Sequence, residues 1–530
     1  MSYSKNNTFD YSTLTPSKEL EYDVVVIGSG AGGGITSEIL SRSGLKVLIV
    51  EEGPLKTSQD FKMQEKIAYA DLYQENAGRQ TVDKGIQILQ GRAVGGSTTV
   101  NWTSSFRTPR ETLQFWETEF SVKGLLRDQL SPWFDWVEKR LNISKWMVPP
   151  NQNNQLLADG LKSLGWKHAF IPRNVKGCSN LGYCGMGCPI NAKQSMLVST
   201  IPGALENGAQ LIHRARAESL IIQAGKVNGV WLSSMDNYGQ VKVKNVTKVT
   251  AKMVVLAAGS IGSPAVLLRS QAADPYATLG GRTFLHPVSV TVAKMAERVD
   301  AFSGAPQSVY SDEFLWRDGV RGELGYKIEV PPMHPLVSST LMLKHAKQHT
   351  DLMKNLPYYQ ANLSLIRDGF NPDSQGGQVS LDENGYPQLD YQISDTVWRA
   401  LRESMLSMAE LQFAVGAQKV LPLHMDSSML TSWKETKQLI KQLPADKLRW
   451  QTMSAHQMGG CGMGSDEKTS VVNSRGEHHQ LENLTVIDGS LFPTSLGVNP
   501  QLTIYTIAAK LASQLANRMN ADLPKDLARI

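Results

Sequence analysis

Val24-Val25-Val26-Ile27-Gly28-Ser29-Gly30-Ala31-Gly32-Gly33 is the stretch that decides the fold. An apolar run ends at a glycine-rich turn, and small residues then continue into a predicted helix over 31–40. Gly28 allows the tight turn, Gly30 lets the backbone approach a pyrophosphate, and Gly33 lets the helix pack closely on the strand. This strand–turn–helix context predicts a bound dinucleotide, with its phosphates at the N-terminus of the helix.

Further apolar strands with similar endings recur far along the chain. A run over 46–50 ends in Glu51, which stands where an acidic side chain binds a ribose hydroxyl in such folds. Two more glycine-ended strands cover 254–259 and 484–489, and a helix is expected from Pro500 to Asn517. Because these distant pieces share one style, we predict an α/β fold with one doubly wound parallel sheet assembled from interleaved segments.

Composition narrows the class of protein. The 530 residues are 41% hydrophobic and 19% charged, which is typical of packed cores and of more than one domain. A net charge of +5 with scattered basic residues gives no support for nucleic-acid binding. No segment approaches the roughly 18 apolar residues of a membrane span, residues 1–7 lack the apolar core of a signal peptide, and four cysteines make no disulfide framework. We therefore expect a cytoplasmic protein without a transmembrane segment, and peripheral contact with a membrane stays open.

Residues 290–450 have a different texture. Segments 378–381 and 388–393 alternate polar and apolar positions around Asn384-Gly385, which predicts an antiparallel hairpin. The same region is rich in methionine, which either lines an adaptable apolar pocket or fills a core. The methionines concerned are Met405, Met408, Met425 and Met429.

Further motifs follow in a fixed order: 51–54, 91–101, 258–264, 281–287, 454–461, 488–490 and 497–500. Together with Gly28–Gly33, they resemble the glucose–methanol–choline flavoprotein oxidoreductases along nearly the whole chain. The closing segments look most like those of long-chain alcohol oxidases, and next like those of cholesterol oxidases. The resemblance implies FAD rather than NAD as the cofactor, and a CH–OH donor as the substrate.

The resemblance distributes FAD binding over many residues. Gly95-Gly96-Ser97 by itself offers backbone amides and a hydroxyl that can approach a pyrophosphate or a flavin edge. Some relatives carry a histidine covalently bonded to FAD at the position of Val100, and valine cannot form that bond, so we expect non-covalent FAD. The implied FAD-binding residues are Gly28, Gly30, Gly33, Glu51, Arg92, Gly95, Gly96, Ser97, Asn101, Asp488, Gly489, Asn499 and Pro500.

His456 and Asn499 are the predicted catalytic residues. Oxidation of an alcohol by hydride transfer to flavin N5 requires removal of the hydroxyl proton, and a histidine suits that step because its ordinary pKa is near neutrality. An asparagine amide can hydrogen-bond the oxygen without competing for the proton. His456 matches the family's base position. Asn499 is also expected to cap a helix whose first residue is Pro500, aiming the positive helix end at the flavin.

Other reactive side chains receive structural assignments. His286 belongs to a motif that the resemblance makes structural, under the flavin domain, and Cys461 is expected to pack beside the flavin. Cys178, Cys184 and Cys188 are clustered, a pattern similar to iron–sulfur ligation, and three thiols could also hold zinc with a remote ligand. We favour a glycine-rich loop with reduced thiols and no metal over an iron–sulfur cluster.

These inferences give one domain order. We expect FAD-binding parts at 15–110, 201–290 and 451–530, a cap or substrate region with the cysteine-rich loop at 111–200, and a substrate-binding domain at 291–450. The fold is then a Rossmann-type doubly wound FAD-binding domain interleaved with an α+β substrate domain built on an antiparallel sheet.

The expected function is FAD-dependent oxidation of an apolar primary or secondary alcohol to an aldehyde or ketone. Oxygen, a quinone or a cytochrome would accept the electrons, and the last two would make the protein an electron-transferring dehydrogenase. A lyase on the same fold or a non-catalytic flavoprotein would also be consistent with the FAD-binding motifs. The pairing of His456 with Asn499 favours redox turnover over the lyase.

Overall fold

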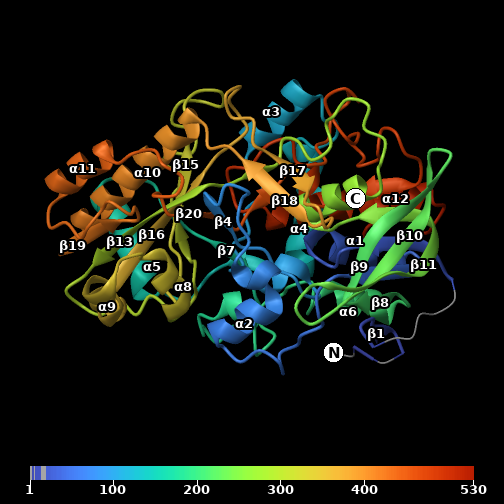
Figure 1. Ribbon diagram of the computed structural model, residues 1–530, viewed down its shortest axis with the longest axis horizontal. Helices are drawn as coiled ribbons and strands as arrows, with labels where there is room; N and C mark the ends of the chain where they lie inside the picture. Colours follow the sequence, from blue (N-terminus) through green and yellow to red (C-terminus); the bar gives the residue numbers. More distant parts are fainter. Residues whose placement is uncertain (1–2, 5, 14–18) are drawn as a thin grey trace.

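A computed structural model describes residues 3–4, 6–13 and 19–530. Two large sheets lie toward opposite ends of an elongated molecule, with helices packed on both (Figure 1). The expected domain boundary at residue 15 lies outside the described residues.

The first sheet is the predicted nucleotide-binding sheet. Its strand order is β1-β8-β3-β2-β11-β10-β9, with β22 paired to β11. Parallel pairing joins the strands from β1 to β11 and also β22, whereas β9 and β10 extend the sheet as antiparallel strands. Segments far apart in the chain therefore meet in one sheet, which confirms the interleaved, doubly wound fold. Its strands are β1 Thr8–Asp10, β2 Leu20–Ile27, β3 Val47–Glu51, β8 Gln210–His213, β9 Ala215–Gln223, β10 Lys226–Met235, β11 Val241–Leu256 and β22 Leu484–Val486.

Helix α1 follows β2 through the glycine-rich turn and packs against α12 and α6. A side chain at Gly33 would overlap the carbonyl oxygen of Gly28, so the close approach of α1 to β2 requires glycine there, in agreement with the packing role expected for Gly33. The helices around this sheet are α1 Ala31–Arg42, α4 Arg127–Arg140, α6 Thr200–Glu206, α7 Gly259–Arg269 and α12 Gln501–Arg518.

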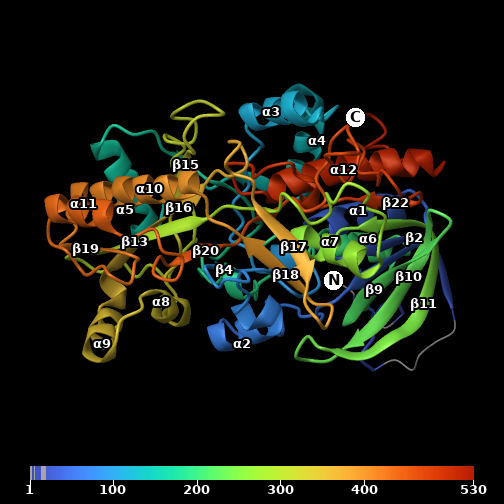
Figure 2. The same ribbon diagram turned by 45° about the horizontal axis from the view of Figure 1, so that its top comes forward.

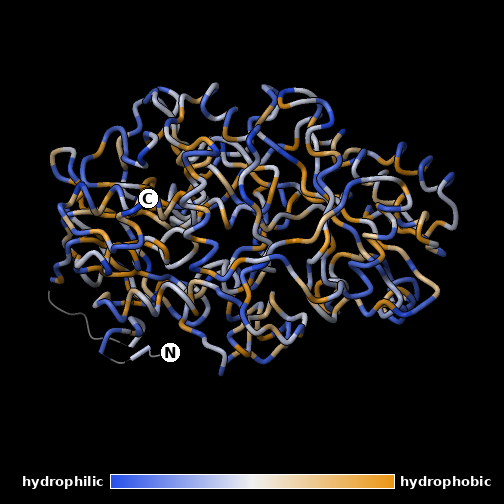
Figure 3. Tube along the Cα trace, turned by 180° about the vertical axis from the view of Figure 1, so that it is seen from behind, coloured by the Kyte–Doolittle hydropathy of each residue, from blue (hydrophilic) through white to orange (hydrophobic). Residues whose placement is uncertain are grey.

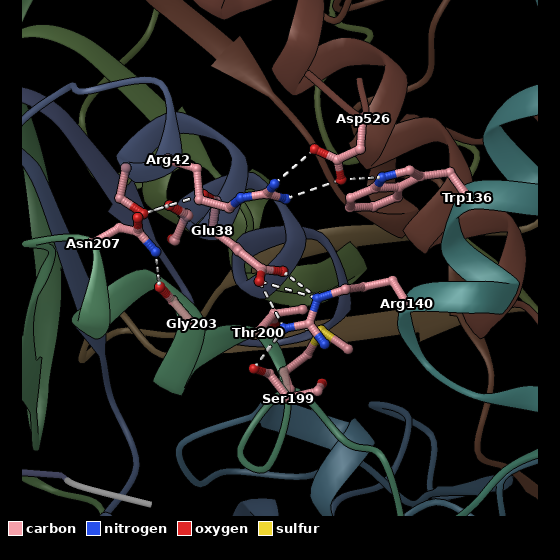
Figure 4. A network of polar contacts seen from close by, with 12 residues as sticks. Glu38, Arg42, Trp136, Arg140, Ser199, Thr200, Gly203, Asn207 and Asp526 are labelled. Carbon is pink, nitrogen blue, oxygen red and sulfur yellow. Dashed lines mark hydrogen bonds and ion pairs between the residues drawn. The ribbon is translucent and has the colours of Figure 1, made fainter. Parts of the chain in front are cut away.

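A buried ion pair fixes α1 to its neighbours (Figure 4). Glu38 of α1 accepts hydrogen bonds from Nε and Nη2 of Arg140 at the end of α4, the shortest of them 2.6 Å. Arg140 Nη2 also donates to the carbonyl oxygen of Ser199, directly before α6. Glu38 is nearly fully buried, whereas the neighbouring pair of Arg42 and Asp526 lies at the surface.

The second sheet has the strand order β15-β16-β13-β20-β4, with β19 paired to β13. All of its pairings are antiparallel except that of β20 with β4. Helix α10 covers this sheet and is itself flanked by α5 and α11 (Figure 2). The elements are β4 Ile86–Ile88, β13 Val288–Lys294, β15 Tyr326–Glu329, β16 Tyr359–Ile366, β19 Lys419–Pro422, β20 Thr452–Ser454, α5 Gln152–Ser163, α10 Asp395–Ala414 and α11 Trp433–Gln442.

The predicted hairpin is present, and of the two alternatives for the methionines the core holds for Met405 and Met408. Strands β17 Gly377–Leu381 and β18 Pro387–Tyr391 pair antiparallel around Asn384-Gly385. Met405 and Met408 are fully buried in the core beneath α10, because they lie on the face of that helix that packs on the second sheet. Met429 packs against the same core, and Met425 is exposed.

The domain boundaries predicted from the sequence stay predictions, and some strands do not fit them. β1 precedes residue 15 and pairs in the nucleotide-binding sheet. β4 and β20 lie in segments expected to bind FAD, yet both belong to the antiparallel sheet, and β13 spans the boundary at 290. The chain therefore alternates between the two sheets in shorter segments than the predicted domain order implies.

The remaining elements are short or peripheral. Among the residues with assigned positions, no helix is long and apolar enough to cross a membrane. Apolar stretches gather toward the interior, and the outer turns are largely hydrophilic (Figure 3). The elements not yet named include α2 Glu65–Leu72, η1 Gln74–Ala77, η2 Gly96–Thr99, α3 Arg110–Phe120, β5 Ile143–Lys145, β6 Ala169–Phe170, β7 Pro172–Asn174, η3 Cys184–Met186, β12 Phe284–Leu285, β14 Val309–Tyr310, α8 Pro335–Leu341, α9 Ala346–Lys354, η4 Leu356–Tyr358, β21 Gln457–Met458 and η5 Gly489–Leu491.

Candidate active site

A cavity of about 550 Å³ is bordered by residues from both sheets and by the N-termini of α1 and α12. Most of the predicted FAD-binding residues line it, together with His456 and Val100. Gly33 and Gly95 do not line it: Gly33 packs on the backbone of Gly28, and the amide of Gly95 donates to Ser29. The second sheet contributes apolar side chains to the lining. The lining residues include Gly28, Gly30, Gly32, Glu51, Arg92, Gly96, Ser97, Val100, Asn101, Gln307, Val288, Glu329, Leu363, Leu365, Met453, His456, Asp488, Gly489, Asn499 and Pro500.

Glycines at the start of α1 and in the turn at 95–96 keep this part of the cavity wall free of side chains. Gly96 has a φ of +54°, and a Cβ there would come within 2.8 Å of the Gly30 Cα. Gly95 has a φ of +91°, and its amide donates to Ser29 Oγ at 2.9 Å. The two glycine-rich turns therefore pack against each other, and their backbone can approach a phosphate closely.

Glu51 lies at the end of β3, as predicted, and lines the cavity. Its carboxylate accepts hydrogen bonds from the amide of Gly53 at 2.8 Å and from the amide and hydroxyl of Ser29, at 3.1 and 2.6 Å. Burial raises the pKa of Glu51, while these hydrogen bonds oppose the rise. Glu51 thus both orders the glycine-rich turn and presents its carboxylate to the cavity.

Arg92 supplies an unsatisfied cation to the same cavity. Its side chain is buried, and Nη1 has no hydrogen-bond partner among the residues that the structure describes. Because the Arg92 guanidinium lines the cavity, it would attract an anionic group bound there.

Asp488 and Asn101 act mainly as organisers. Asp488 Oδ2 accepts from the amide of Gly259 at 2.7 Å and from Ser263 Oγ at 2.6 Å, which ties β22 to the start of α7. Asn101 Nδ2 donates to Gln501 Oε1 at 2.7 Å, so it orders the first turn of α12. Both residues line the cavity beside Ser97 and Gly489.

His456 lines the cavity and is coupled to His286. The two Nδ1 atoms are 3.0 Å apart, and His286 Nε2 accepts from the amide of Gly497 at 3.1 Å. Burial and the Lys327 ammonium lower the pKa of His456 to about 4, and burial lowers that of His286 as well. The structural assignment of His286 is therefore incomplete, because His286 contacts the predicted catalytic histidine directly.

Asn499 does not cap a helix, so that prediction is wrong. Helix α12 begins at Gln501, Pro500 occupies the N-cap position, and no side chain caps it. Asn499 Nδ2 instead donates to Glu329 Oε2 at 3.2 Å, because that buried carboxylate is within reach. Asn499 Oδ1 faces no partner among the described residues. The N-terminus of α12 still borders the cavity, as expected.

Glu329 lines the cavity and Lys327 is its ion-pair partner, although no sequence motif marks either of them. Both are completely buried in β15, and Lys327 Nζ is 3.8 Å from Glu329 Oε1. The Lys327 ammonium also lies over the rings of Phe106 and Tyr310. Glu329 Oε2 accepts from Gln307 Nε2 at 2.8 Å. The available signal was two opposite charges at alternate positions of a short apolar strand, which place both on one face of the sheet.

The cysteine-rich loop packs against the cavity wall at residues 99–101. Lys193 Nζ donates to the carbonyl oxygens of Thr99, Asn101 and Cys184 at 2.6, 3.0 and 2.8 Å, which joins the loop to the cavity wall. Within the described part of the chain, no three His, Cys, Asp or Glu side chains are arranged to hold a metal ion. The metal-free loop stays a prediction. Cys461 is buried, and burial raises the pKa of its thiol.

Comparison with known proteins identifies the family. Models of the N-terminal and C-terminal parts of the GMC oxidoreductases match residues 69–288 and 372–508. The chain belongs to the GMC oxidoreductase family. It is 28% identical over 522 residues to a long-chain-alcohol oxidase of Arabidopsis thaliana, covering 94% of this chain and 68% of the relative. It is 30% identical over 497 residues to an uncharacterized GMC-type oxidoreductase of Mycobacterium tuberculosis, covering 93% and 75%.

Solved structures share the fold of this GMC oxidoreductase. A formate oxidase of Aspergillus oryzae superimposes with a TM-score of 0.71 at 15% identity, over 95% of this chain and 99% of the other. Pyridoxine 4-oxidase from Mesorbium loti gives a TM-score of 0.68 at 15% identity, over 94% and 99%. The protein is therefore an FAD-dependent oxidoreductase that acts on CH–OH donors.

The cavity fits FAD. Backbone at the start of α1 and at Gly96 is open to a pyrophosphate, the unpartnered Arg92 suits its charge, and Glu51 is placed for a ribose hydroxyl.

Replacing Glu51 by alanine should weaken FAD binding. The variant loses a charge-assisted hydrogen bond to the ribose, worth about 1.5–3 kcal/mol, or about 10- to 150-fold in Kd. It also leaves the Ser29 and Gly53 amides without their acceptor. Titration of the apoprotein with FAD measures the effect, and Glu51→Gln, which keeps the shape but not the charge, should lose less. Unchanged affinity in Glu51→Ala would remove Glu51 from the FAD site.

Proposed function

We propose that this GMC oxidoreductase oxidises an apolar primary or secondary alcohol to an aldehyde or ketone. The observation that carries the proposal is that His456, Asn499 and an apolar wall line the same cavity. That wall comes from the second sheet and consists of Val288, Leu363, Leu365 and Met453. The similarity to a long-chain-alcohol oxidase of Arabidopsis thaliana supports this substrate class.

Bound FAD supplies the oxidant, which accepts a hydride from the alcohol carbon. The protein's own groups bind the alcohol oxygen, exclude water and take the hydroxyl proton. His456 Nε2 is the ring nitrogen available to the alcohol, because His286 occupies Nδ1. Asn499 adds a partner for the same oxygen through its free Oδ1 or its second amide hydrogen.

Two cavity groups can accept the hydroxyl proton. His456 is the base expected from the sequence, and Glu329 is the candidate that the structure adds. Both line the cavity, and Glu329 pairs across the second sheet with Leu363 of the apolar wall. FAD is proposed to bind non-covalently, since Val100 lines the cavity where a covalently linked residue would stand and has no nucleophile.

An anaerobic screen of alcohols tests the proposed function. Linear and branched apolar alcohols are expected to bleach the flavin absorbance of the purified protein, while carboxylic acids of matched size should not. Reoxidation of the bleached protein by oxygen, a quinone or cytochrome c then identifies the acceptor. We propose oxygen, in line with the alcohol oxidase relatives.

The screen also separates the competing classes of flavoprotein. A lyase would convert its substrate while the flavin ends each turnover oxidised, and a non-catalytic flavoprotein would neither bleach nor turn over. If no alcohol of any size bleaches the flavin, the proposed function is wrong. Fast reoxidation by a quinone or cytochrome with slow reoxidation by oxygen would make the protein an electron-transferring dehydrogenase.

A further inference from the structure

Exposed apolar side chains gather on one face of the molecule. Six of the sixteen large apolar side chains that are well exposed in the described part of the chain belong to three segments, 56–72, 176–191 and 334–354. Single exposed apolar residues are ordinary, but a group of them marks a surface that something covers. Each of the six is 38–44% exposed, and we call them together the apolar face: Met63, Ile67, Leu181, Ile190, Leu336 and Leu343.

Polar bonds and a ring contact hold the three segments together. Two amides at the start of α8 donate to the carboxylate of Glu65 in α2, at 2.6 and 2.9 Å. Asn191 Nδ2 donates to Ser58 Oγ at 3.1 Å, which joins the cysteine-rich loop to the segment before α2. The loop also packs on the residue before α8 through the rings of Tyr183 and His334. Helices α2 and α8 lie side by side in both views (Figures 1 and 2), so the apolar face is one surface.

Lysines lie among the residues of the apolar face. The three segments carry seven lysines and four acidic residues. Lys56 is paired with Asp71, whereas Lys62, Lys66 and Lys347 are exposed and in no ion pair with a described residue. Apolar side chains interspersed with unpaired lysines complement a surface that is apolar inside and negatively charged outside.

The apolar face adjoins a wall of the FAD cavity. Helix α2 runs on into Tyr73, which lines the cavity and donates through its hydroxyl to the carbonyl oxygen of Gly185 at 2.7 Å. A Cβ on Gly185 would come within 3.1 Å of Trp102 Nε1, and Trp102 also lines the cavity. Tyr73 and Trp102 therefore line the cavity and also contact the loop that carries Leu181 and Ile190.

We propose that the apolar face docks on an anionic lipid bilayer, from which the apolar alcohol enters the cavity. The apolar side chains enter the boundary between headgroups and acyl chains, and the lysines contact lipid phosphates. A second copy of the chain fits this face less well, because the unpaired lysines of the two copies would meet and lysine is depleted at protein–protein interfaces. The delivery of the alcohol rests on the proposed function, whereas the docking does not.

Flotation of the FAD-loaded protein with lipid vesicles tests the docking. We expect binding to vesicles of phosphatidylcholine and phosphatidylglycerol, and binding at least about tenfold weaker to vesicles of phosphatidylcholine alone, which lack the negative charge. Added salt should weaken the binding to anionic vesicles because it screens the lysines. Replacing Lys62, Lys66 and Lys347 by glutamine should weaken it by about fivefold per lysine.

An apolar double variant and a matched control address the apolar side chains. Ile67→Ser combined with Leu336→Ser should weaken binding to anionic vesicles about tenfold or more, because two side chains no longer leave water. Val243→Ser combined with Leu448→Ser should bind like the wild type. Val243 and Leu448 are 51% and 58% exposed and lie in β11 and after α11, outside the three segments. FAD content and melting temperature check that each variant is folded.

Two results would overturn the docking on lipid. One is no binding of the wild type to anionic vesicles, or equal binding by Ile67→Ser combined with Leu336→Ser. The other comes from sedimentation equilibrium without lipid. A wild-type dimer that the same double variant converts to a monomer would make the apolar face a contact between two copies of the chain.

Activity measurements test the delivery of the alcohol separately. With 1-hexadecanol dissolved in anionic vesicles, the apolar double variant should lose kcat/KM by about the factor that it loses in vesicle affinity. A short, water-soluble alcohol that bleaches the flavin should reduce both proteins at the same rate. Equal kcat/KM with hexadecanol, or a wild type that oxidises short alcohols but not hexadecanol, would overturn the delivery. If no alcohol bleaches the wild type, the proposed function fails, and flotation still decides the docking.

Discussion

Replacing His456 by alanine should leave FAD bound and slow the reduction of flavin by alcohol about 10²–10³-fold. The side chain lines the cavity, and its Nε2 is the nitrogen free to bind the alcohol oxygen. Loss of one positioned donor at an oxygen that gains negative charge costs rates of about this size. Stopped-flow absorbance at saturating alcohol measures the effect, and the FAD content should stay at one per chain.

The pH profile sharpens this prediction. His456 has a pKa of about 4, lowered by burial and by Lys327, so it stays neutral throughout pH 5–9. Replacing His456 by alanine therefore lowers the rate of flavin reduction over this pH range, and the shape of the pH profile stays the same. The exposed His168, replaced by alanine, is the matched control and should leave the rate unchanged. Reduction of His456→Ala at the wild-type rate would show that His456 does not contact the reacting oxygen.

The parts of the fold that sequence predicted are those built from local patterns. The strand–turn–helix at 24–40 could be predicted because its glycines meet local requirements of the turn and of helix packing. Helix α1 begins at Ala31, as expected. The hairpin at Asn384-Gly385 was readable for the same reason. The partners of β4 and β20 were not, because these short strands pair with segments more than 150 residues away.

The catalytic end of the cavity depends on contacts between distant segments. Asn499 looked like a helix cap, and its local sequence supports that interpretation. The carboxylate that draws its amide away is Glu329, 170 positions earlier in the chain. Likewise, nothing local to His286 indicates that it contacts His456. Sequence motifs located the residues that a family shares, and only the assembled fold shows which of them act together.

The largest loss of stability is expected from Arg140→Met. Arg140 is the ion-pair partner of Glu38, whose side chain is only 5% exposed. Without Arg140 the Glu38 carboxylate loses its hydrogen bonds and its ion-pair partner and keeps only the more distant charge of Arg42; breaking a buried pair in this way costs about 3–5 kcal/mol. Urea unfolding followed by circular dichroism measures the change, as a lower midpoint at an unchanged slope.

Two comparisons separate this effect from a general loss of surface charge. Arg42→Met, on the same helix as Glu38, removes the exposed pair with Asp526 and should cost only about 0–1 kcal/mol (Figure 4). Combining Glu38→Gln with Arg140→Met removes the buried charge, so the double variant should be more stable than Arg140→Met alone.

The pH dependence of the Arg140→Met defect follows from the ionisation of Glu38. Burial raises the pKa of Glu38 above its ordinary value, and Arg140 opposes that rise. In Arg140→Met the folded-state pKa is therefore higher still, while the unfolded value is unchanged. A group with a raised folded-state pKa costs stability as the pH climbs through that pKa, because the folded protein must either hold an unpaired charge or keep its proton. The defect should thus be larger at pH 8 than at pH 5. An equal defect at both values, or an equal loss in Arg42→Met, would mean that the buried charge of Glu38 is not what Arg140 stabilises.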